Sequence, residues 1–190
     1  MKGLEKMKKN KNKNIFTRED LSDSFENPIE KNGYRLVVFP DELVDSPEDW
    51  EENTLVVSFH RNYGSNHGYS SMEEAIKDAR SKKLKSYVLY GYEHSGLSLS
   101  LTDEIYPYND RWDSGIYGIL ITDKNKKDAE EFIKLYSKYL SGDIYCFNLY
   151  KIKKCECCGS DISEVIEGSG GFYDPDEMVD CINYAINHQK

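Results

Sequence analysis

The chain has 190 residues, of which 38% are hydrophobic, and a formal net charge of −9. A chain of this length without a long linker suits one domain with its own hydrophobic core. Its apolar runs are far shorter than the roughly 20 residues that cross a bilayer, which excludes a membrane-spanning protein.

The N-terminal segment differs in composition from the rest of the chain. Six lysines lie within Met1–Asn14 against the single Glu5, so this segment is basic and the remainder is acidic. Residues 1–30 are poor in apolar groups and bury too little surface to offset their ordering entropy, so we expect a disordered tail there. No apolar segment follows Lys13, so we expect no secretory leader and a cytoplasmic protein.

Residues 31–190 are expected to form a single α+β domain. Runs of β-branched and aromatic residues predict strands, and apolar residues at helical spacing after a capping residue predict helices. In the first half of the domain, the pattern predicts strands at 34–39 and 54–60, a helix after Ser71, and a hairpin of strands 87–93 and 97–101. In the second half, it predicts a strand at 116–122, a helix over 129–140, and strands at 144–152 and 164–166. A flexible loop at Gly168, Gly170 and Gly171 and a helix from Asp174-Pro175 follow. Consecutive strands favour an antiparallel or mixed sheet of about five to seven strands with three helices.

The charge and the cysteines restrict partners and compartment. The acidic body would repel a phosphate backbone, which argues against nucleic acid as its partner and permits a basic protein partner. Five cysteines, an odd number, include the close group Cys155, Cys157 and Cys158. This usage fits free or metal-bound thiols in a reducing cytosol better than a disulfide framework.

Three histidines and one carboxylate form the first candidate site. His60, His67, His94 and Asp113 each lie at or beside a predicted strand end. Imidazole and carboxylate groups together can bind a transition metal, or act as base and orienting group in hydrolysis. These residues therefore indicate a metal-assisted hydrolase as one alternative. The other alternative is that they close turns by bonding to the nearby backbone.

Cysteines form the second candidate site. The stretch from Cys155 to Gly159 contains Cys-x-x-Cys-Gly, the pattern of a zinc knuckle. It predicts Cys155 and Cys158 as ligands of a structural zinc ion, within one chain or shared across a dimer. A structural site needs four ligands and the chain has no second Cys-x-x-Cys, so a turn with free thiols and no cofactor is the alternative.

Aromatic residues indicate a binding surface. The chain has 15 tyrosines. Tyrosine and tryptophan suit protein interfaces because each combines a large apolar body with a polar tip, although tyrosine also suits a sheet core. We therefore predict a protein-binding surface at Tyr92, Tyr106, Tyr108 and Trp112.

Three stretches of the sequence resemble an uncharacterised group of proteins encoded by phages, prophages and plasmids of Gram-positive bacteria. They are Phe59-His60-Arg61-x-Tyr63, the run from Tyr92 to Ser100, and Trp112-Asp113-Ser114-Gly115. The resemblance implies a genomic context rather than a chemistry. Small acidic proteins of mobile elements often bind host enzymes, so it implies a non-enzymatic binding protein that acts on a host protein, for example as an anti-defence or host-takeover factor.

Overall fold

The computed structural model describes residues 14–25, 27–62, 64, 67–94, 96–101 and 112–188. The chain forms two compact units. Unit 1 comprises Met1–Asp41 and Ile144–Lys190, and unit 2 comprises Glu42–Asp143. Unit 2 is therefore an insertion in the chain of unit 1. None of the described helices has the length and apolar character needed to span a bilayer.

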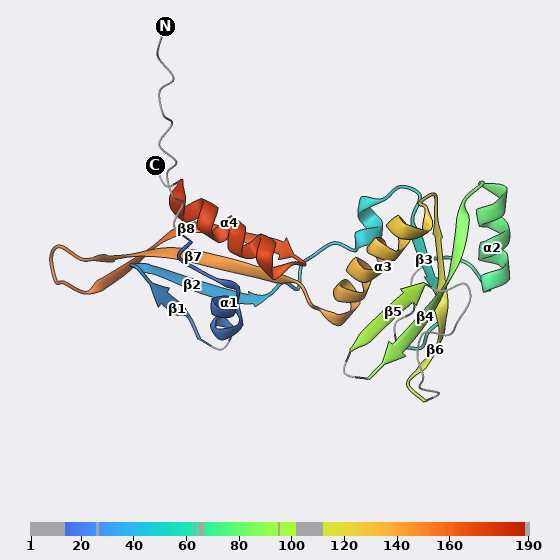
Figure 1. The fold of residues 1–190 in the computed structure, drawn as a ribbon, viewed down its shortest axis with the longest axis horizontal. Helices are drawn as coiled ribbons and strands as arrows, with labels where there is room; N and C mark the ends of the chain where they lie inside the picture. The colour runs from blue at the N-terminus through green and yellow to red at the C-terminus, as the bar shows by residue number, and fades with distance from the viewer. Residues whose placement is uncertain are drawn as a thin grey trace, which may run out of the picture. The chain divides into compact units, whose positions relative to one another are not determined.

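Unit 2 contains a four-stranded antiparallel sheet with the strand order β3-β6-β4-β5. Each pair of neighbouring strands is antiparallel, so β3 and β4 run in the same direction on either side of β6 (Figure 1). The elements of unit 2 are the 3-10 helix η1 (Pro47–Trp50), β3 (Leu55–Ser58), α2 (Met72–Ser81), β4 (Lys85–Glu93), β5 (Leu97–Leu101), β6 (Ser114–Thr122) and α3 (Lys126–Ser141).

Strand β6 is covered on both faces over residues 117–122. Leu120 packs with Phe132 and Ile133 of α3. Ile119, one position earlier, packs with Ala75 of α2 on the other face. Because both faces are covered, β6 is an almost continuous apolar run instead of an alternating pattern.

Unit 1 is a four-stranded antiparallel sheet with the order β1-β2-β7-β8 and helices on one face. Figure 1 shows β7 and β8 continuing past β1 and β2 as a two-stranded hairpin. The elements of unit 1 are α1 (Arg18–Ser24), β1 (Ile29–Lys31), β2 (Tyr34–Pro40), β7 (Tyr145–Lys154), β8 (Asp161–Phe172) and α4 (Pro175–Asn187).

The core of unit 1 includes residues close to the N-terminus. Phe16 and Leu21 are buried together with Leu36 of β2, Phe147 of β7 and Ile182 of α4. These five apolar residues come from both ends of the chain. The packing of α1 therefore depends on contacts with α4 that form only in the folded unit.

Asn183 of α4 fixes the segment before α1 by hydrogen bonds. Its Oδ1 accepts from the backbone N of Ile15 at 2.8 Å and of Phe16 at 3.2 Å. Its Nδ2 donates to the backbone O of Phe16 at 2.9 Å and of Val179 at 3.0 Å. Two acceptor and two donor positions of the buried amide are thus satisfied, as burial of a polar group requires.

The α+β class is confirmed, but the predicted element count is wrong. The described residues form four α-helices and eight strands in two sheets, instead of three helices and one sheet of about five to seven strands. The predicted single domain over residues 31–190 contains two compact units. Strand pairing depends on contacts distant in sequence, so local patterns do not reveal that the strands divide into two sets.

Two local predictions also differ from the structure. Part of the predicted tail at residues 1–30 is folded, because α1 occupies Arg18–Ser24, while residues 1–13 lie outside the described part of the chain. The predicted strand at 164–166 is part of β8, which runs from Asp161 to Phe172 through the glycines predicted as a loop. β8 is largely exposed, so it lacks the apolar alternation by which strands are recognised.

Candidate functional site

A pocket of about 540 Å³ opens in unit 2 at the end of β4 and the starts of β5 and β6. Three chain segments supply its polar side chains. The loop after β3 supplies His60, the β4–β5 hairpin supplies Glu93 and His94, and the segment that enters β6 supplies Trp112 and Asp113. The three stretches quoted above for their resemblance therefore meet at one site within one unit.

The pocket contains two pairs of a histidine and a carboxylate. His94 Nδ1 lies 3.3 Å from Asp113 Oδ2, within hydrogen-bond reach. His60 Nε2 lies 3.9 Å from Glu93 Oε2, too far for a hydrogen bond but close enough for an ion pair when the imidazole is charged. The backbone N of Glu93 donates to the backbone O of Asp113 at 2.7 Å, which fixes the two carboxylate-bearing segments side by side.

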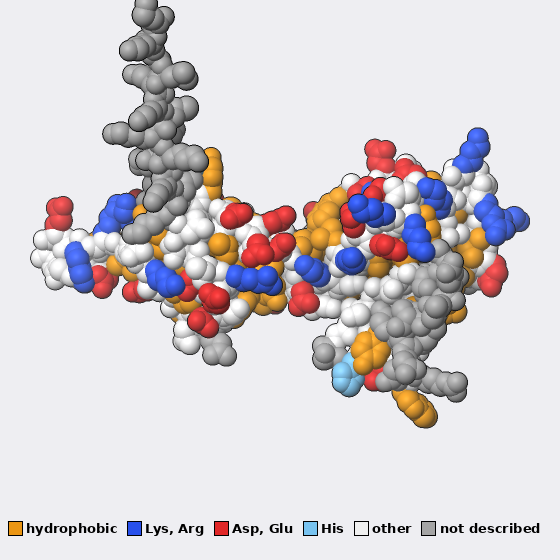
Figure 2. Space-filling model, in the orientation of Figure 1, with side chains coloured by type: hydrophobic (Ala, Val, Ile, Leu, Met, Phe, Trp, Pro, Cys, Tyr) orange, Lys and Arg blue, Asp and Glu red, His pale blue; other side chains and the backbone are white. Residues whose placement is uncertain are grey.

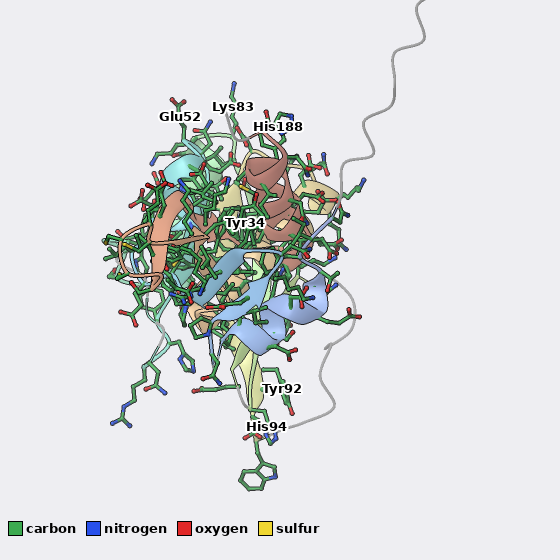
Figure 3. The ribbon with its side chains drawn as sticks, turned by 90° about the vertical axis from the view of Figure 1, so that its left-hand side faces the viewer. Tyr34, Glu52, Lys83, Tyr92, His94 and His188 are labelled. Atoms are coloured by element: carbon green, nitrogen blue, oxygen red, sulfur yellow. The ribbon has the colours of Figure 1, made fainter. Side chains whose placement is uncertain are left out.

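Aromatic rings position both imidazoles. The His60 ring stacks on buried Tyr117, with 5.8 Å between centroids. The His94 ring stacks on half-buried Tyr92 at 6.0 Å. Figure 3 shows Tyr92 and His94 together at one end of the β4–β5 hairpin. Tyr92, which the sequence predicted as a binding residue, thus stacks on His94 of the pocket.

His67, the third predicted histidine, does not line this pocket. Its Nε2 lies 3.2 Å from the backbone O of Ser58, and its Nδ1 accepts from the backbone N of Tyr69 at 3.1 Å. Its ring also packs against Phe59, at 4.7 Å between centroids. Both nitrogens and the ring therefore serve to close the loop between β3 and α2.

The pocket side chains are not arranged as a metal centre. Within the described part of the chain, the only group of three or more histidine, cysteine or acidic ligand atoms within 4.8 Å of one another is formed by cysteines. His60, Glu93, His94 and Asp113 line one cavity without meeting at one point. They can accept and donate hydrogen bonds and attract a cation.

Exposed apolar groups surround the pocket. Trp112 is 95% exposed and Ile116 is 59% exposed, and both line the pocket. Of the four predicted binding residues, Trp112 therefore has the accessibility that an anchor residue requires, and Tyr92 is half-buried. Tyr106 and Tyr108 lie outside the described residues.

The second site is the tip of the β7–β8 hairpin. The sulfur atoms of Cys155, Cys157 and Cys158 lie within 4.8 Å of one another, so this group could hold a metal ion. The backbone N of Cys155 donates to Ser160 O and that of Gly159 donates to Cys155 O, both at 2.8 Å. Gly159 has a φ of +71°, a left-handed conformation that suits glycine and closes the turn.

Hydrogen bonds stabilise negative charge at this tip. The Cys157 thiol and the backbone amides of Cys157 and Cys158 donate to the Cys155 sulfur, which lowers the pKa of Cys155 to about 7. The Ser160 hydroxyl and amide likewise lower the pKa of Cys158. The turn therefore favours thiolates, the form of cysteine that binds metals.

The two remaining cysteines have a different environment. Cys146 and Cys181 are half-buried, and burial is the main reason that the pKa of each thiol is raised. Neither belongs to the cysteine group at the tip. Cys181 packs against the unit 1 core, and Cys146 Sγ donates to the backbone O of Phe39 at 3.5 Å.

Sequence reasoning did not identify Glu93 as a site residue, and it placed Cys157 in the cysteine group without predicting it as one of the two knuckle ligands. Glu93 stands directly before His94, and Cys157 lies between the two predicted ligands, so both were adjacent to predicted residues. A search for acidic residues beside candidate histidines would have found Glu93. Its pairing with His60, which is distant in sequence, required the fold.

Comparisons of this chain with protein family profiles, with curated proteins and with solved structures find no match. The functional conclusions below therefore depend on the geometry of the two sites.

Proposed function

We propose that the protein is a non-enzymatic binding protein whose unit 2 pocket captures an arginine side chain of another protein. The observation that carries this proposal is the combination, in one pocket, of Glu93 and Asp113 with the exposed Trp112. A guanidinium group bonds carboxylates through its planar fork of donors and stacks on aromatic faces, so this combination suits arginine.

Each carboxylate of the pocket lies beside a histidine. A carboxylate has two oxygens that together accept about four hydrogen bonds. His60 and His94 each lie near one oxygen of their partners, Glu93 and Asp113. A guanidinium group, with five N–H donors, can bond to a carboxylate that already accepts from a neighbouring side chain.

The local charge of the pocket supports the proposal more than the overall charge does. On the face drawn in Figure 2, acidic side chains are interspersed with lysines and arginines, so that face shows no acidic patch. A partner attracted only by the net charge of −9 would bind without preference for a site. Two carboxylates beside a tryptophan provide such a preference.

Tryptophan fluorescence can test the pocket directly. The chain has two tryptophans, so Trp50→Phe leaves Trp112 as the only reporter. We expect a glycine-flanked arginine peptide to change the Trp112 emission, and the matching citrulline peptide, which is similar in shape but uncharged, to have no effect. Asp113→Asn and Glu93→Gln should each weaken arginine binding by at least about tenfold, because a hydrogen bond to a charged group contributes about 1.5–3 kcal/mol.

A surface carboxylate provides the matched control. Glu131 on α3 is exposed and does not line the pocket, so Glu131→Gln makes the same chemical change elsewhere in unit 2. This variant should bind the arginine peptide as the parent does. Equal responses to arginine and citrulline, or equal losses in all three charge variants, would refute capture of arginine by this pocket.

The nature of the partner is a further part of the proposal. The resemblance to proteins of phages and plasmids supports a host protein as the partner, with an anti-defence or host-takeover role. Pull-down from a bacterial lysate would test this. Trp112→Ala should lose a partner that Trp50→Ala retains, because Trp50 belongs to η1 and is not a pocket residue.

A metal-assisted hydrolase is the second candidate, since His60, His94 and Asp113 do line one cavity. Their failure to meet within 4.8 Å argues against it. Incubation with zinc or manganese and a chromogenic phosphodiester is the simplest test. Turnover that disappears in both His60→Ala and His94→Ala but persists in His67→Ala would favour the hydrolase over the binding protein.

We also propose that the metal suited to the cysteine tip is zinc with a structural role, bound by Cys155 and Cys158. Tetrahedral zinc accepts thiolates readily and binding couples to local folding. Metal analysis of the purified chain tests this, and Cys158→Ser should abolish the retained zinc.

A further inference from the structure

The tip of the β7–β8 hairpin projects beyond the rest of the unit 1 sheet. β2 pairs with β7 as far as Tyr34 opposite Lys151, whereas β8 stays paired with β7 to Asp161 opposite Lys154. Figure 1 shows the two strands reaching a tip beside which no other helix or strand of unit 1 lies. Residues 156–160 are all exposed. A second molecule can therefore approach the cysteines.

One tip supplies too few ligands for a structural zinc ion. Such a site holds zinc with four protein ligands in tetrahedral geometry. Within the described part of the chain, no fourth ligand atom joins the group of Cys155, Cys157 and Cys158. In a single copy, therefore, at least one of the four coordination positions of a zinc ion has no ligand from this group.

The turn favours two of its three cysteines as ligands. Cys155 and Cys158 have the Cys-x-x-Cys spacing of a zinc knuckle, and backbone amides donate to both sulfurs. The Cys157 sulfur lies 2.9 Å from that of Cys155. Two thiolates on one tetrahedral zinc ion are about 3.8 Å apart, as follows from a Zn–S distance of about 2.3 Å. Cys157 is thus placed as a hydrogen-bond partner of Cys155.

We propose that two copies of this chain meet at their hairpin tips and share one zinc ion, held by Cys155 and Cys158 of each copy. This inference rests on the zinc site proposed above. A two-fold axis through the ion makes the two tips equivalent and completes a set of four thiolates. The site is incomplete without the second copy.

The charges of the hairpin permit this approach. Lys153 pairs with Glu164, and Lys154 Nζ lies 2.7 Å from Asp161 Oδ1, so positive and negative charges balance along the strands next to the tip. Two such tips meet without strong like-charge repulsion. The contact between two turns is far smaller than a standard protein interface, so the dimer depends on the metal.

Light scattering and metal analysis of the full chain in a non-thiol reductant test the proposal together. We expect one zinc ion per two chains and a mass twice the 22.0 kDa of the single chain. A zinc chelator should convert the dimer to the monomer, and zinc, but not magnesium, should restore it. Cys158→Ser should be monomeric and free of zinc, while the matched Cys157→Ser should remain a zinc-bound dimer.

Other outcomes separate this inference from the zinc site itself. One zinc ion per chain in a monomer, lost in Cys157→Ser, would show a three-thiolate site in a single copy. That result would overturn the proposal that two copies share the ion, but not the zinc site itself. Absence of zinc from the protein prepared with zinc would overturn both. A dimer that persists in chelator and in Cys158→Ser would place the interface elsewhere and also overturn the sharing.

Discussion

Replacement of Phe16 by alanine should lower the free energy of unfolding by about 3–5 kcal/mol, the usual cost of removing a fully buried aromatic side chain. Phe16 has no exposed surface and packs in the same cluster as Leu36 and Ile182. The cavity would lie between the sheet and the helices of unit 1. Urea unfolding followed by far-ultraviolet circular dichroism measures the change.

Phe25 provides the matched control, because it belongs to the same N-terminal segment and is 42% exposed. Phe25→Ala should cost much less than Phe16→Ala. A second control begins the chain at Asn14, which keeps every contact described for Phe16. An unfolding midpoint for Phe16→Ala equal to that of Phe25→Ala would contradict the docking of this segment.

Gly118→Ala should destabilise unit 2 by about 3 kcal/mol or more, at the upper end of the usual cost of overpacking. A Cβ atom at Gly118 would lie 2.2 Å from the backbone O of Val57 and 3.1 Å from the Cα of Ser58. These are backbone atoms of β3, so the contact cannot be relieved by rotation of a side chain. The strand pair β3–β6 would have to separate.

Gly115 on the same strand is the control for this substitution. Among the described residues, no atom lies within 4 Å of a Cβ built there, so Gly115→Ala should change stability by less than about 0.5 kcal/mol. Both tryptophans, Trp50 and Trp112, belong to unit 2, so tryptophan fluorescence during urea unfolding follows the affected unit. Equal stability of the two variants would show that β3 and β6 are less closely packed than described.

The parts of the fold that were predictable have strong local signals. Helix α2 begins after Ser71, whose Oγ accepts from the backbone N of Glu74 at 3.2 Å, as the capping pattern predicts. The β4–β5 hairpin, with Glu93 opposite Leu97, follows the predicted alternation. In both elements, neighbouring residues contain the information that determines the structure.

The parts that were not predictable depend on distant contacts. Helix α1 is short and polar, and its burial depends on α4 at the other end of the chain through Asn183. Asn183 is buried beside the apolar face that Met178, Ile182 and Ile186 form, so the apolar pattern of α4 does not include it. The division into two sheets likewise has no local pattern.

In the candidate sites, too, the features that depend on neighbouring residues were predictable and those that depend on distant contacts were not. The proximity of Cys155 and Cys158 was predictable from their spacing, and the structure adds Cys157. The histidines could be identified as candidates, but only the fold shows that His60 and His94 share a pocket while His67 closes a loop. Sequence separation contains no information on which of three histidines converge.

The insertion of unit 2 determines the order in which the ribosome delivers the two sheets. β1 and β2 leave the ribosome early, but only three residue pairs join them, and two strands alone are marginally stable in water. Their long partner, β7, is made only after all of Glu42–Asp143. Unit 2 can therefore fold during synthesis while unit 1 is still incomplete. During that time Leu36 and Val38 of β2, which are buried in the folded protein, remain exposed to solvent. Unit 1 can close only after β7, β8 and α4 have been made.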